Sequence, residues 1–90
     1  MVLVQMTVKV ADVPRFMEAA KKYDPIMAEA GARNQRILTD ENDPNLVSSL
    51  SEWESHDAMH KASEEWGDRY NADAGTEGLQ WETHIWHIAS

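Results

Sequence analysis

The chain opens with residues that alternate, with a period of two, between a uniformly apolar face and a mixed one. The apolar face consists of Val2, Val4, Met6, Val8 and Val10. A strict period of two is typical of a β-strand, so we expect a strand from Val2 to Val10. Its apolar face should pack against helices, and its mixed face should meet solvent or a second sheet.

The next stretch repeats its apolar residues at the spacing of an α-helix. Asp12 can cap the first turn, and Pro14 lies where a missing N–H is harmless. The apolar positions are Val13, Phe16, Ala20, Tyr23 and Met27. We predict a helix over residues 13–30 that is bent or split at Pro25 and ends at a left-handed Gly31.

Strand and loop patterns fill most of the remaining chain. Residues 33–39 read as a weaker strand and residues 46–53 as another, with the turn-forming residues 40–45 between them. Residues 71–78 are mostly small and predict a loop, whereas residues 79–88 alternate again. Both faces of this last strand carry aromatic residues, so we expect both faces to be covered.

The stretch from Ser55 to Tyr70 has the pattern of an amphipathic helix. Ser55 can cap its first turn. Successive residues are about 100° apart, which gathers an apolar stripe of Met59, Ala62, Trp66 and Tyr70 opposite a charged face. His56 and His60 lie at the margin of that stripe, where a polar group can look into a cavity.

The order of these elements is strand, helix, strand, strand, helix, strand. It predicts an α+β protein with the ferredoxin-like βαββαβ arrangement, in which one four-stranded antiparallel sheet carries both helices on one face. We interpret residues 1–90 as one domain of this kind. The aromatic outer face of the last strand predicts a homodimer, because a second copy packed sheet to sheet would bury it.

Composition narrows the choice of partner and compartment. The 90 residues contain 8 Lys and Arg against 16 Asp and Glu, which gives a net charge of −8. Such a chain repels phosphate backbones and anionic lipids, so we expect neither nucleic acid nor membrane as a partner. There is no Cys, no run of apolar residues long enough to span a bilayer and no signal-peptide pattern. These features favour a cytoplasmic protein.

Three blocks of residues carry a likeness to a known family. They are Glu29–Ala32 at the end of the first helix, Asp43-Pro44 in the hairpin, and Glu52–Ser55 followed by Ala58 and His60. Together they resemble the antibiotic biosynthesis monooxygenase (ABM) domain of the dimeric α+β barrel superfamily. The resemblance implies a homodimer of ferredoxin-like subunits, each with a pocket between its helices and its sheet.

The resemblance also implies an activity. The better-understood enzymes of the family oxidise phenolic or anthrone-like polyketides with dioxygen, without flavin or metal, in an apolar aromatic pocket. Trp53 corresponds to a pocket tryptophan of that branch, whereas Ser49 and Met59 stand where it has Asn and Tyr. We therefore carry two hypotheses: a cofactor-independent monooxygenase for a small aromatic or polyketide-like molecule, and a non-catalytic small-ligand-binding or stress-associated protein.

In the first hypothesis His60 is the catalytic base, since an imidazole with a pKa of about 6.5 suits proton abstraction near neutrality. The expected pocket residues are Ser49, Trp53, His56, Met59, Trp66 and Tyr70. Trp53, Trp66 and Tyr70 have a simpler interpretation as core residues. His56 and His60 form an i,i+4 pair that suits a divalent metal, so a metal-assisted reaction is a third interpretation. No third ligand is evident, so we expect no metal, and the resemblance implies no cofactor.

Overall fold

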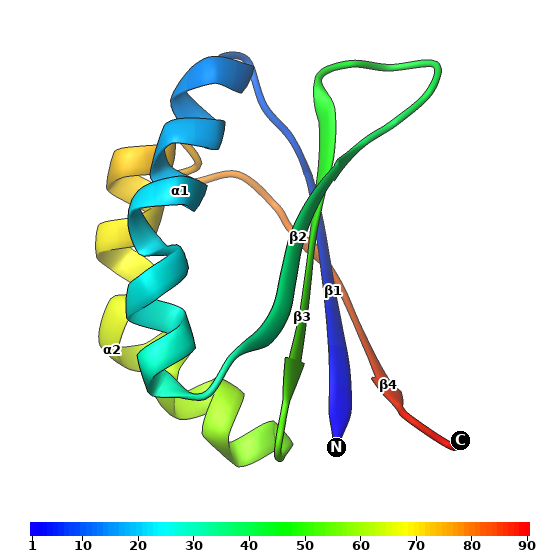
Figure 1. Ribbon diagram of the computed structural model, residues 1–90. Helices are drawn as coiled ribbons and strands as arrows, with labels where there is room; N and C mark the ends of the chain where they lie inside the picture. Colours follow the sequence, from blue (N-terminus) through cyan, green and yellow to red (C-terminus); the bar gives the residue numbers. More distant parts are fainter.

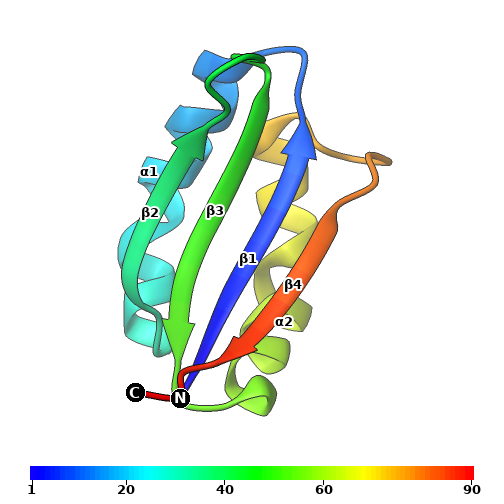
Figure 2. The same cartoon turned by 90° about the vertical axis from the view of Figure 1, so that its right-hand side faces the viewer.

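The computed structural model describes residues 1–90 and contains six elements in the predicted order (Figure 1). They are β1 (Val2–Lys9), α1 (Val13–Ala30), β2 (Arg33–Thr39), β3 (Leu46–Trp53), α2 (His56–Ala74) and β4 (Glu82–His87). The strands form one antiparallel sheet in the order β2-β3-β1-β4. Figure 2 shows both helices behind the sheet, whose other face is open. The predicted ferredoxin-like α+β fold is confirmed.

Both helices begin at the predicted caps. The Asp12 side chain accepts a hydrogen bond from the backbone N–H of Arg15 at 3.1 Å, and Ser55 caps α2 in the same way. Pro25 lies inside α1, which runs unbroken over the predicted residues 13–30. Gly31 ends α1 with a φ of 123°, a value that favours glycine.

The second helix is longer than the sequence pattern predicts. It continues beyond Tyr70 to Ala74, so residues expected to begin a loop are helical. Arg15 donates hydrogen bonds to the carbonyl oxygens of Ala72 and Asp73, at 2.7 and 3.0 Å. These carbonyls belong to the last turn of the helix, which lacks partners of its own. A residue almost sixty positions earlier therefore supports the extra turn.

The last strand is shorter than predicted. Residues 79–88 were expected to be extended, but β4 begins only at Glu82, which pairs with Thr7. The preceding Trp81 instead packs against Phe16 of α1, with ring centroids 6.2 Å apart. The Trp81 indole is therefore partly buried against α1, and the pairing of β4 with β1 does not extend to this residue.

The core lies between the sheet and the helices and forms two clusters. The first comprises Val8, Val10, Phe16, Ala19, Val47 and Ala74. The second comprises Val2, Val4, Ala32, Trp53 and Ala62. The apolar face of β1 packs against the helices as predicted, but Met6, between Val4 and Val8 on that face, is only half-buried. Close packing is therefore interrupted in the middle of the sheet.

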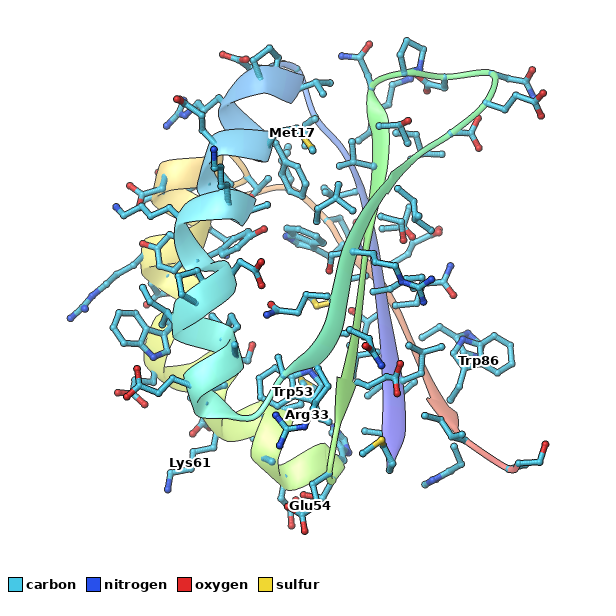
Figure 3. All side chains as sticks on the ribbon, viewed as in Figure 1. Met17, Arg33, Trp53, Glu54, Lys61 and Trp86 are labelled. Carbon is cyan, nitrogen blue, oxygen red and sulfur yellow. The ribbon has the colours of Figure 1, made fainter.

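The open face of the sheet exposes large apolar side chains. Trp86 is 49% exposed and Leu38 44% exposed. In Figure 3 the Trp86 side chain points away from the helices. It stacks on His84, with ring centroids 4.1 Å apart, and its indole N–H donates to Gln5 at 3.3 Å. Neither helix is both long and apolar enough to cross a membrane.

Candidate functional site

A cavity of about 480 Å³ lies between the two helices and the sheet. This volume is within the range of small-molecule sites. Its wall is mostly apolar and includes four methionines and four aromatic rings: Met6, Met17, Met27, Met59, Tyr23, Trp53, Tyr70 and Trp81. Aromatic rings offer flat apolar surface, and methionine side chains adapt to different shapes. The wall therefore suits a small, flat, apolar molecule.

Small residues on β3 provide the space for this cavity. Val47 and Trp53 are buried on the helix-facing side of the strand. Ser49 and Ser51 lie between them on the same side and line the cavity. Ser49 pairs with the half-buried Met6 of β1. Because two serines occupy positions where a core strand would carry large side chains, the space above them is unfilled.

The mouth of the cavity lies between α1 and β2. The exposed residues of α1 in the wall are Met17, Lys21 and Asp24. Figure 3 shows Met17 and Trp53 near opposite ends of the space between the helices and the sheet. The opening therefore carries two charged groups of α1, whereas the interior is mostly apolar.

One polar contact joins the two sides of the mouth. The amide nitrogen of Gln35 donates to the carbonyl oxygen of Asp24 at 3.0 Å and also to its carboxylate. A register shift between Arg33 and Arg36 places Gln35 in the wall of the cavity. Asn34, within that irregularity, has a φ of 51° and donates to Glu52. Asp24 and Gln35 are not among the predicted site residues, because nothing in their spacing along the chain indicates the irregularity.

The polar atoms of Trp53 and Tyr70, two aromatic residues of the wall, have different environments. The Trp53 indole N–H donates to the Ser51 hydroxyl at 2.9 Å. Trp53 is thus both a core residue and part of the wall, and its indole nitrogen already has a hydrogen-bond partner. Tyr70 packs against Tyr23, with ring centroids 5.2 Å apart, and burial raises the pKa of its hydroxyl to about 12. Tyr70 is therefore a neutral phenol at physiological pH.

Four of the seven predicted site residues line this cavity: Ser49, Trp53, Met59 and Tyr70. His56, His60 and Trp66 do not. The Trp66 ring packs against the Tyr23 ring, with centroids 6.4 Å apart. The guanidinium carbon of Arg69 lies 5.0 Å from the centroid of the Trp66 ring.

The two histidines lie on the outer side of α2. The His60 side chain is 66% exposed, and its Nε2 is 3.1 Å from a carboxylate oxygen of Glu64. Because consecutive helical residues are about 100° apart, His60 turns to solvent when Met59 faces the cavity. The expectation that His56 and His60 look into the pocket is therefore corrected. Nowhere in the chain do three His, Cys, Asp or Glu side chains converge as a metal site would need, so the paired histidines lack a third ligand.

Comparison with known proteins identifies the family. The family profile described as antibiotic biosynthesis monooxygenase matches residues 1–70. The chain belongs to this family. No protein of curated function matches it.

Solved structures share the fold of this ABM chain. A candidate antibiotic biosynthesis monooxygenase from Bordetella bronchiseptica superposes with a TM-score of 0.84 at 14% identity, covering 99% of this chain and 97% of that one. SnoaB, a cofactor-independent oxygenase from Streptomyces nogalater, gives a TM-score of 0.76 at 18% identity, covering 99% and 92%. At these identities the likeness establishes the fold alone.

Proposed function

We propose that this ABM protein is a cofactor-independent monooxygenase that binds a small aromatic or polyketide-like molecule in the cavity between its helices and its sheet. The observation that carries the proposal is the cavity itself, with its methionine and aromatic wall, in a chain of this family. The oxygenase SnoaB, which shares the fold, supports the same reaction class.

The reaction needs little chemistry from the protein. A methylene group between two aromatic rings loses a proton to give a carbanion, which transfers electrons to dioxygen. One oxygen atom replaces the two hydrogens as a carbonyl oxygen, and the other leaves as water. The apolar wall holds the substrate flat and keeps bulk water from the carbanion.

We assign the proton-accepting role to Asp24. It is the one carboxylate in the wall, and the wall contains no histidine. The hydrogen bonds from Gln35 hold Asp24 at the mouth. His60, the base expected from the sequence, instead lies on the outer face of α2 beside Glu64.

Oxygen uptake with a panel of anthrones and hydroquinones tests this proposal. We expect enzyme-dependent uptake, and we expect Asp24→Asn to lower its rate by about a hundredfold or more, the usual contribution of a general base. His60→Ala is the matched control and should keep the rate. If His60→Ala abolishes uptake and Asp24→Asn does not, the role of base belongs to His60.

The alternative function is binding of a small aromatic ligand without turnover. Its supporting observation is that the only carboxylate of the wall is solvent-exposed and already accepts a hydrogen bond from Gln35. It predicts that members of the same panel raise the melting temperature of the protein while no oxygen is consumed.

A further inference from the structure

The two tyrosines of the chain both line the cavity, but their hydroxyl groups differ. The Tyr23 hydroxyl donates to a carboxylate oxygen of Asp73 at 2.7 Å. The Tyr70 hydroxyl makes no hydrogen bond to the protein, and yet no buried side-chain oxygen or nitrogen in the structure lacks a partner. The Tyr70 oxygen is therefore not sealed in the core, and it reaches open space.

The cavity is the open space that Tyr70 borders. The Tyr70 ring is half-buried and packs edge to face on Phe16 at 6.4 Å and against Tyr23 at 5.2 Å. Tyr70 lines the cavity, and burial raises the pKa of its hydroxyl to about 12. Tyr70 thus presents a neutral O–H donor, held in place by two rings, to whatever molecule fills the cavity.

The neighbouring polar group of the wall is also a donor. Asn71 lines the cavity, and its side-chain oxygen accepts a hydrogen bond from the Thr76 hydroxyl at 2.7 Å. This leaves the amide N–H groups of Asn71 available. This part of the wall therefore presents hydrogen-bond donors, and a ligand with an acceptor oxygen can bond to them.

We propose that Tyr70 is a specificity-determining residue, whose hydroxyl donates a hydrogen bond to the carbonyl oxygen of a flat aromatic ligand. The cavity then selects an aromatic ketone over a hydrocarbon of the same shape. This inference rests on the proposed function of the cavity as an aromatic-ligand site. One enclosed neutral hydrogen bond corresponds to a preference of about tenfold in affinity.

Equilibrium dialysis with 9-fluorenone and fluorene tests the assignment, because the two probes share one planar skeleton and differ in the carbonyl oxygen. The unchanged protein should bind 9-fluorenone about tenfold more tightly than fluorene. Tyr70→Phe should bind the two probes equally, with fluorene affinity retained. If Tyr70→Phe keeps the preference for 9-fluorenone, the assignment is overturned.

Tyr23→Phe is the matched control, because it removes a hydroxyl that is bonded to Asp73. It should keep the tenfold ratio between the probes, even if both affinities fall together. Binding of both probes with equal affinity by the unchanged protein would overturn the role of Tyr70 and leave the cavity proposal standing. Binding of neither probe would overturn both.

Discussion

Arg15 lies in the first turn of α1 and stabilises the last turn of α2. Its guanidinium donates to the carbonyl oxygens of Ala72 and Asp73. A cation here also complements the negative end of the helix dipole. Gly75 follows the helix with a φ of 74°, and a side chain there would come within 3.2 Å of the Arg15 guanidinium. The contact therefore depends on both residues.

Substitution of Arg15 tests this contact. Arg15→Ala leaves the carbonyl groups at the end of α2 without their partner, so we expect a loss of about 1–2 kcal/mol in the free energy of unfolding. Urea denaturation followed by circular dichroism measures it. Arg33→Ala is the control, because Arg33 is exposed and takes part in none of the ion pairs of the structure. An equal loss in both variants would contradict the role of Arg15.

Tyr70 predicts how stability depends on alkaline pH. Burial raises its pKa in the folded protein from 10.0 to about 12. The folded state therefore keeps this proton in a range where the unfolded chain has lost it. The stabilisation is complete below pH 10 and is lost as the pH rises toward 12, by about 2–3 kcal/mol in total.

The Tyr23→Phe chain, in which Tyr70 is the remaining tyrosine, isolates this effect. At pH 11 its tyrosinate absorbance should be low in the folded state and should appear when urea unfolds it. The Tyr70→Phe chain should lose less stability between pH 10 and 12 than the unchanged protein. Full ionisation of Tyr70 at pH 11 in the folded chain would contradict its burial.

At the scale of the elements, the sequence predicts features that depend on neighbouring residues, but not features that depend on tertiary contacts. Asp12 and Ser55 were predicted as caps because a capping side chain acts within its own turn. The end of α2 was missed because it depends on the distant Arg15. The position of Gln35 was missed because a register shift is set by strand pairing rather than by a local pattern.

The same distinction applies to the candidate site. Ser49 and Trp53 were predicted, and the period of two along β3 would also have found Ser51. The margin of an amphipathic helix does not say which edge faces a cavity, so His60 was placed on the wrong side. The precise rotation of α2 comes from its packing on α1 and the sheet, which no single-helix pattern contains.

The two serines on β3 offer a direct test of the cavity. Ser49→Leu adds an apolar side chain to the unfilled space in the middle of the sheet. Because it fills space that already exists, we expect the free energy of unfolding to change by less than about 1.5 kcal/mol. Affinity for 9-fluorenone should fall by at least about tenfold, since the ligand and the new side chain compete for one volume.

Ser49→Ala is the companion variant, because it removes the hydroxyl and keeps the space. It separates loss of volume from loss of a polar group. Dialysis measures affinity, and urea denaturation measures stability. If Ser49→Leu binds the probe as tightly as the unchanged protein, the ligand does not occupy this cavity.

At the scale of the whole molecule, the two faces of the sheet have different environments. One face is covered by both helices (Figure 2) and encloses the cavity, whereas the other exposes Trp86 (Figure 3) and also Leu38. Aromatic residues such as Trp are enriched at protein–protein interfaces. We propose that a second copy covers the open face, with the two sheets packed face to face about a two-fold axis.

The dimer depends on Trp86 if this proposal holds. Trp86→Glu replaces an exposed indole with a charge that the interface would have to bury without a partner, so we expect the dissociation constant to rise by at least about thirtyfold.

Lys61→Ala is the control: it makes the net charge more negative by the same one unit, on the helix face away from the sheet (Figure 3). Sedimentation velocity across a range of concentrations should show a dimer for the unchanged protein and for Lys61→Ala, and a monomer for Trp86→Glu. A monomer for the unchanged protein at every concentration would contradict the proposal. A dimer that survives Trp86→Glu would instead move the interface away from the open face of the sheet.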